Sequence, residues 1–229
     1  MNETAYISPD TKPLRYPFLI EAPALATEIS HAYNIRMEFL PAGWSRPYLD
    51  AVVRAFRLVK NAQNYMEIYS RDKGHFAWVS SLMKPNTTLV DVDDIHFPDN
   101  EQNLSKYLGP EQKFLRIAGN PLDRDNVNLL QNNTKDMKFD VIYVNGDAYY
   151  GNFLSIFDLY FDFLSPGGYL ITLDAYWEGD ASRKGKSQAL ALIDRHHPVY
   201  CIHMNEPVHR FRPPEVVGGE WGTVAIILK

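Results

Sequence analysis

The feature that most limits the fold of this chain is an alternation of short apolar runs with amphipathic segments between residues 65 and 228. Parallel strands buried on both faces have continuous apolar runs, and the helices that connect them repeat their apolar residues with a period of about 3.6. Seven runs fit strands, at Tyr65–Ser70, Thr88–Asp93, Phe114–Ala118, Phe139–Asn145, Tyr169–Asp174, Val199–His203 and Thr223–Leu228. Five segments fit helices, at Gly74–Lys84, Asn100–Leu108, Arg124–Asn132, Tyr149–Leu164 and Ser182–His196. The pattern predicts an α/β fold with a mostly parallel sheet and helices on both faces.

The last two predicted strands are expected to pair in the opposite sense. The segment between them is rich in proline and glycine, with Pro207, Pro213, Pro214, Gly218 and Gly219. Parallel neighbours need a crossover connection, usually a helix, whereas antiparallel neighbours are joined by a turn. We therefore expect a seven-stranded sheet that ends in an antiparallel β-hairpin.

The N-terminal residues differ from the rest of the chain. Residues 1–44 carry five prolines, at Pro9, Pro13, Pro17, Pro23 and Pro41. This composition favours an irregular arm or cap over a regular helix. From Ser45 to Ala62 apolar residues recur at three- and four-residue spacing, which predicts an amphipathic helix. The chain thus divides into an arm, residues 1–44, and one α/β domain, residues 45–229. The arm either covers the pocket or packs on a partner subunit. In the second case the protein would be a homo-oligomer, and the sequence leaves both alternatives.

Composition excludes several classes of protein. The 229 residues contain 23 Lys+Arg and 28 Asp+Glu, a formal net charge of −5. A surface that tracks nucleic-acid phosphates needs clustered basic residues, and the chain has no sustained basic run. No apolar run approaches the roughly 20 residues that span a bilayer, and residues 1–10 lack a signal-peptide pattern. The single cysteine, Cys201, excludes an intramolecular disulfide. We expect a cytoplasmic protein that binds neither nucleic acid nor membrane.

Polar residues gather where the predicted strands end, which is where open α/β sheets bind their ligands. Asp93 closes the second strand. An acid at this place commonly accepts hydrogen bonds from the ribose hydroxyls of a nucleotide-like cofactor, and a turn or helix cap is the equally weighted alternative. Asp91, inside the same strand, is either exposed at a sheet edge or paired with a neighbour.

Later strands are followed by further candidates. Asp147 follows the fourth strand in an Asn-Gly-Asp segment, and Asp174 ends the fifth. Together these acids are placed to hold a cation or orient a hydroxyl, although turn chemistry explains each of them singly. His203 ends the sixth strand and is a candidate general base, with a surface or core histidine as the alternative.

Two stretches carry a family resemblance. Residues 139–150 and 164–171 read FDVIYVNGDAYY and LSPGGYLI, which resemble the "FD-apolar-IDGD-x-x-Y … L-x-PGGY" run of class I S-adenosylmethionine (SAM)-dependent methyltransferases of the macrocin O-methyltransferase type. Residues 66–74 (MEIYSRDKG) and 90–93 (VDVD) resemble the "EIG-x-x-x-GG" cofactor loop and the "VGVD" ribose-binding strand of that family. The resemblance covers about residues 65–195 in outline, and it implies a Rossmann-like seven-stranded sheet with SAM as cofactor.

The resemblance also implies roles for individual residues. Glu67, Tyr69 and Gly74 would line the methionine end of the cofactor, Asp93 its ribose hydroxyls, and Gly119 and Asn120 its adenine edge. Asn145 and Asp174 would lie at two metal- or acceptor-binding positions.

The chain departs from the family at its loop and its metal site. Tyr69 stands where the family has its first loop glycine, so a bulky ring occupies space beside the cofactor. The usual metal-binding acids appear as Asn145 and Leu173, and a leucine cannot bind a metal ion, so we expect no tight Mg²⁺ site.

These observations support two functional hypotheses. The first is SAM-dependent methyl transfer to a hydroxyl of a small molecule, such as a sugar or natural product, with Asp147, Asp174 and His203 orienting the acceptor and removing its proton. The second is a catalytically inactive methyltransferase-fold module for binding or assembly, which Tyr69 and Leu173 favour.

Overall fold

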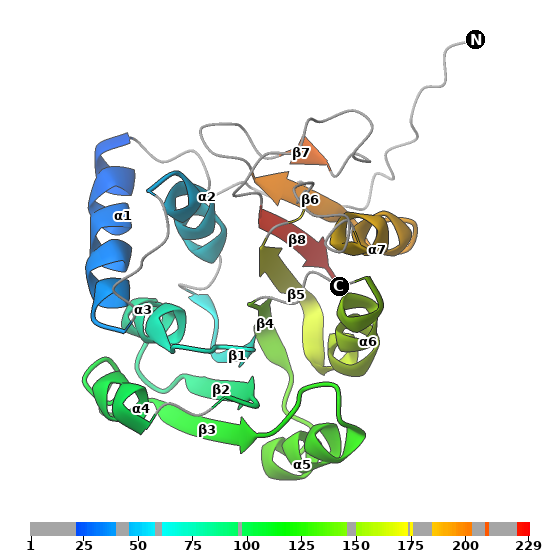
Figure 1. Ribbon diagram of the computed structural model, residues 1–229, viewed down its shortest axis with the longest axis horizontal. Coiled ribbons are helices and arrows are strands. Elements are labelled where there is room, and N and C mark those ends of the chain that lie inside the picture. Colours follow the sequence, from blue (N-terminus) through cyan, green and yellow to red (C-terminus); the bar gives the residue numbers. More distant parts are fainter. Residues whose placement is uncertain are drawn as a thin grey trace.

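An eight-stranded mixed sheet forms the centre of the molecule (Figure 1). The computed structural model describes residues 22–39, 46–57, 61–95, 98–145, 150–173, 175, 185–202, 209–210 and 224–229. The strands are β1 (Asn64–Ile68), β2 (Thr88–Asp93), β3 (Lys113–Ala118), β4 (Phe139–Val144), β5 (Leu164–Leu173), β6 (Val199–Ile202), β7 (His209–Arg210) and β8 (Val224–Leu228). Their order across the sheet is β3-β2-β1-β4-β5-β8-β6-β7. Strands β3, β2, β1, β4 and β5 are parallel, and β8 is antiparallel to both β5 and β6.

Helices cover both faces of the sheet. One face carries α1 (Ala22–Met37), α2 (Arg46–Phe56), α3 (Gly74–Leu82) and α4 (Pro98–Leu104), and the other carries α5 (Arg124–Thr134), α6 (Tyr150–Tyr160) and α7 (Gly185–Ile193). Successive strand residues point to opposite faces, so Tyr65 and Tyr143 pack under the first group of helices and Met66 and Ile142 under the second. Within the described residues no helix is both long and apolar enough to cross a membrane.

The α/β fold and its mixed sheet confirm the sequence prediction, with differences at β7 and β5. The predicted antiparallel pairing of the last two strands is present as β6 with β8, and the two-residue strand β7 adds an eighth strand beside β6. Strand β5 starts at Leu164 instead of Tyr169. The pairing of β5 with β4 shifts register between Phe139 and Val141 of β4, and Gly167 of β5 has a φ of 77°. Strand β5 therefore runs through the Gly167–Gly168 pair with an irregular pairing instead of starting after it.

The expectation of an irregular segment before residue 44 was wrong for residues 22–37, which form α1. Pro23 lies in the first turn of that helix, where a missing N–H interrupts no intrahelical hydrogen bond. Ala32 and Ile35 of α1 lie in the same hydrophobic core as the sheet, and Arg57 pairs with Glu28 at 2.6 Å between Nη2 and Oε2. Residues 1–21 and 40–45 lie outside the described residues, so the domain boundary at residue 44 stays a prediction.

Phe56 anchors α2 on the sheet. Its ring is fully buried, and ring centroids of Tyr143, Tyr65 and Trp78 lie 4.9, 6.4 and 5.6 Å from its own. Edge-to-face contacts at these distances add to the free energy gained by burying the ring. The helix therefore depends on this side chain for its packing on β1 and β4.

We expect Phe56→Ala to lower the free energy of unfolding by about 3–5 kcal/mol, because it leaves a cavity among these three aromatic rings. Urea denaturation followed by circular dichroism measures the change. Leu129→Ala is the control: Leu129 is 45% exposed, and its loss should change stability by less than about 0.5 kcal/mol. A loss below about 1 kcal/mol for Phe56→Ala would contradict this packing of α2.

Candidate functional site

Backbone hydrogen bonds bring the predicted site residues to one edge of the sheet. Tyr69 N donates to Val92 O over 2.9 Å, and Asn145 N donates to Ile68 O over 2.9 Å. These bonds align the carboxyl ends of β1, β2 and β4. Likewise, Gly119 N donates to Asp93 O over 3.0 Å and joins the end of β3. This edge is where an open α/β sheet binds its ligand.

The loop after β1 has a backbone suited to glycine. Tyr69, Arg71 and Lys73 have φ values of 62°, 54° and 67°, in the left-handed region that side chains disfavour by roughly 1–2 kcal/mol per residue. Tyr69 is only 5% exposed, and its side chain belongs to the hydrophobic core under α5–α7. The exposed Arg71 places its guanidinium carbon 5.3 Å from the centre of the Tyr69 ring. Tyr69 thus adopts the glycine-type backbone of the loop, with its ring packed into the core.

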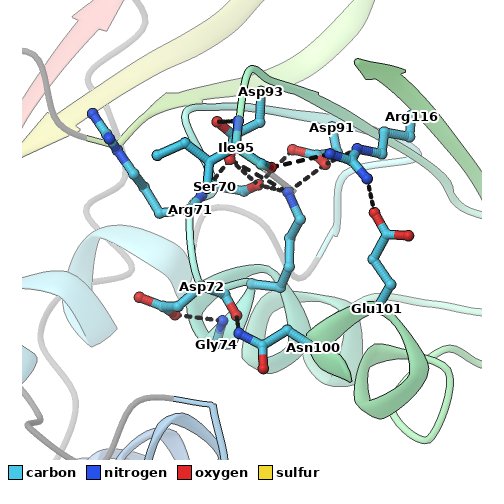
Figure 2. A network of polar contacts seen from close by, with 11 residues as sticks. Ser70, Arg71, Asp72, Gly74, Asp91, Asp93, Ile95, Asn100, Glu101 and Arg116 are labelled. Atoms are coloured by element: carbon cyan, nitrogen blue, oxygen red, sulfur yellow. Dashed lines mark hydrogen bonds and ion pairs between the residues drawn. The ribbon is translucent and has the colours of Figure 1, made fainter. Parts of the chain in front are cut away.

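Asp93 holds this loop against the end of β2. Its Oδ2 accepts from the backbone N–H of Arg71 over 2.5 Å and lies 3.2 Å from Ser70 Oγ, while its Oδ1 accepts from Ile95 N over 3.1 Å (Figure 2). The side chain is fully buried. Backbone donors that converge on one carboxylate fix its position.

A buried ammonium lies beside the same carboxylate. Lys73 Nζ donates to Asp91 Oδ2 over 2.6 Å and to Ser70 Oγ over 2.5 Å, and it lies 3.4 Å from Asp93 Oδ2. The Lys73, Asp91 and Asp93 side chains are all fully buried. Burial raises the pKa of the Asp91 carboxyl, and the Lys73 ammonium opposes part of that rise. Of the two alternatives for Asp91, the structure shows pairing with a neighbour.

The ion cluster continues to β3 and α4. Arg116 of β3 lies with its Nε 3.8 Å from Asp91 Oδ2, its Nη1 pairs with Glu101 of α4, and its Nη2 donates to Ile95 O over 3.0 Å. Figure 2 shows Asp91, Arg116 and Glu101 in sequence along this chain of charges. Lys73 joins it through its ion pair with Asp91. Two basic and three acidic side chains, counting Asp93, therefore connect the loop with β2, β3 and α4.

Gly74 has a packing role in the structure. Gly74 N donates to Asp72 Oδ1 over 2.8 Å, and a Cβ at residue 74 would lie 2.9 Å from that oxygen and 3.2 Å from Phe39 Cβ. The close approach of Phe39, which follows α1, therefore favours glycine here.

The predicted adenine edge contacts α5. Gly119 has a φ of 149°, and a Cβ there would collide with the side chain of Asn126. Asn126 Nδ2 donates to Asn120 O over 3.0 Å, and Asn120 Oδ1 accepts from Leu122 N over 3.0 Å. Both predicted residues thus lie at the sheet edge, in a loop held by α5.

Glu67 lies apart from the other predicted cofactor residues. Its Oε2 accepts from Tyr65 OH over 2.8 Å and lies 3.0 Å from His75 Nδ1, in the core under α1–α4. The ring centroid of His75 lies 4.2 Å from that of Tyr143. Tyr69 packs on the opposite face, so the structure does not bring the Glu67 and Tyr69 side chains together.

None of the three predicted catalytic residues lies in the described part of the chain. Asp147, Asp174 and His203 lie outside the described residues, so their roles stay predictions. Leu173 is 2% exposed and belongs to the core. In the part of the chain that is described, no group of three or more His, Cys, Asp or Glu side chains is arranged to hold a metal ion.

Comparison with known proteins gives the fold. No family model matches the chain, and no curated protein matches it. A putative caffeoyl-CoA O-methyltransferase from Staphylococcus aureus matches 90% of this chain and 98% of its own, with a TM-score of 0.61 and 15% identity. The O-methyltransferase TomG from Streptomyces achromogenes, in complex with SAM, matches 88% and 89% with a TM-score of 0.56 and 14% identity. An O-methyltransferase from Bacillus cereus, in complex with SAH, matches 92% and 93% with a TM-score of 0.55 and 15% identity. The chain has the fold of these O-methyltransferases.

Sequence reasoning missed Lys73 and Ser70 as members of the buried cluster. The available signal was a pair of acids two residues apart in an otherwise apolar strand, at Asp91 and Asp93, which calls for a buried cation. Sequence reasoning also missed the contact of His75 with Glu67, because no local sequence pattern pairs the two residues.

We expect the free energy of unfolding to fall as the pH falls below about 6.5 because of His75. Burial lowers the pKa of His75 from 6.5, and the Glu67 carboxylate opposes part of that fall. The unfolded chain therefore takes up a proton that the folded chain refuses, which costs at most about 1.4 kcal/mol per pH unit. Urea unfolding between about pH 7.5 and about pH 5.5 measures the slope.

The variant His75→Gln should reduce this pH dependence of stability, whereas His196→Gln, at an exposed position, should not. An unchanged slope in His75→Gln would show that other groups cause it.

Proposed function

We propose that this chain is a cytoplasmic SAM-dependent methyltransferase that acts on a hydroxyl of a small molecule. One observation carries the proposal: Asp93, at the end of β2, is held by backbone N–H groups at the edge where the loop after β1 meets β3 and β4. Solved O-methyltransferases with SAM or SAH have the same fold, which supports the assignment. A small acceptor, instead of nucleic acid, suits the net charge of −5.

At this edge of the sheet, the Asp93 carboxylate is the group that fits a ribose. A carboxylate fixed by two backbone donors is a strong acceptor for ribose hydroxyls. Asp93 is fully buried, so a ribose would replace its weaker side-chain partners, Ser70 and Lys73, at 3.2 and 3.4 Å. Gly119, Asn120 and Asn145 would border the same ligand along the sheet edge.

The cofactor, when bound, supplies an electrophilic methyl group. The chain would align the acceptor oxygen with that methyl and remove the hydroxyl proton, so positioning supplies much of the rate. We assign the orientation of the acceptor and the removal of its proton to Asp147, Asp174 and His203.

The second candidate is a non-catalytic module that keeps the fold for binding or assembly. Two observations favour it: the complete burial of Asp93 and the packing of the Tyr69 ring into the core. Both describe a sheet edge that the chain's own side chains fill. Binding of the cofactor distinguishes the two candidates directly.

We expect calorimetric titration of the full chain to show micromolar binding of SAM and SAH. Asp93→Asn keeps the shape of the side chain but removes its charge, so it should weaken binding by about 1.5–3 kcal/mol, roughly 10- to 150-fold in Kd. Asp94→Ala, at the neighbouring exposed acid, is the control and should leave Kd unchanged.

The same titration includes Mg²⁺ and a chelator. Binding and turnover that do not respond to the chelator would agree with the absence of a tight metal site. Failure of both ligands to bind a chain shown to be folded by circular dichroism would reject the methyltransferase function and leave the non-catalytic module.

A further inference from the structure

Lys73 has an unusual place for a lysine. It precedes the first residue of α3, has a left-handed backbone with a φ of 67°, and buries its entire side chain. The backbone favours glycine, and an ammonium buried away from water is costly unless anions surround it. Two carboxylates and a hydroxyl provide that environment here, at 2.5–3.4 Å. The side chain is therefore kept inside the loop by the acids at the end of β2.

The donors to Asp93 fall into two groups. The backbone N–H groups of Arg71 and Ile95 hold the carboxylate at 2.5 and 3.1 Å. Ser70 Oγ and Lys73 Nζ are more distant, at 3.2 and 3.4 Å, and both also bind Asp91 or each other over 2.5–2.6 Å. The side-chain donors are thus the weaker contacts of Asp93 and the ones a ligand would displace.

We propose that Lys73 is a built-in competitor for the cofactor, a role that rests on the proposed function. In the free protein its ammonium neutralises Asp93 and closes the loop over that carboxylate. When a ribose binds, Lys73 gives up Asp93 and stays on Asp91, which it contacts at 2.6 Å. The affinity for the cofactor is then set by the balance of Lys73 between its two acids. This assigns an inhibitory role to a residue inside the cofactor loop itself.

The two acids allow a test with opposite expected signs. In Asp91→Asn, Lys73 loses its stronger anionic partner and turns to Asp93, so SAH should bind about tenfold more weakly. In the double variant Lys73→Met/Asp91→Asn, the ammonium and its partner charge leave together, so no unpaired charge remains between them. Asp93 is then released from its competitor, and SAH should bind about tenfold more tightly than to the wild type.

The experiment is calorimetric titration of the full-length variants with SAH, with folding checked by circular dichroism and thermal unfolding. Tighter binding in the double variant with weaker binding in Asp91→Asn establishes the role of Lys73. Binding with the wild-type Kd in both variants overturns the role of Lys73 and leaves the proposed function intact. If no folded variant binds, both the role of Lys73 and the proposed function are overturned.

Should the double variant not fold, Asp91→Asn alone decides, because unchanged or tighter binding of SAH to that variant contradicts competition by Lys73.

Discussion

The buried ion cluster around Lys73 is the interaction on which the site depends. It joins the loop after β1 to β2 through Asp91 and Asp93, and reaches β3 and α4 through Arg116 and Glu101. Removing charges from water is costly, and a buried pair is stable only when hydrogen bonds satisfy most of its atoms. Lys73 meets this condition with three oxygen neighbours. The positions of the loop and of the three strand ends are therefore coupled through one set of charges.

This coupling gives the acids a double role. Asp91 and Asp93 stabilise the loop through their contacts with Lys73 and the Arg71 N–H, and in the proposed function Asp93 is also the acceptor for a ribose. A site whose acceptor is already satisfied binds a ligand only by the difference between the new contacts and those it gives up. The same geometry thus fits a methyltransferase whose affinity for the cofactor is reduced, or a non-catalytic module whose loop stays closed. The two differ in whether the Lys73 ammonium gives up Asp93 when a ligand binds.

The fold followed from local patterns, whereas the site depended on long-range contacts. Continuous apolar runs located all the strands except the two-residue β7, because burial on both faces leaves a clear signal. The prolines of residues 1–44 do not predict helix α1, because the position of Pro23 in a first turn, where proline is tolerated, is known only from the structure. The partner of Asp91 lies 18 residues earlier in the chain, so only the parallel pairing of β1 with β2 brings Lys73 to it.

The loop also shows why a motif residue does not by itself identify a ligand. Tyr69 and Lys73 adopt left-handed backbones that normally favour glycine, so the path of the chain from β1 to α3 imposes this shape on whichever residues occupy it. Glycine at residue 74 is favoured by the close approach of Phe39, which follows α1. The backbone of the loop after β1 is therefore held in this shape by packing and by ion pairs within the chain. What distinguishes a binding loop from a closed one is the identity of the side chains that fill it, and in this molecule those are the Tyr69 ring and the Lys73 ammonium.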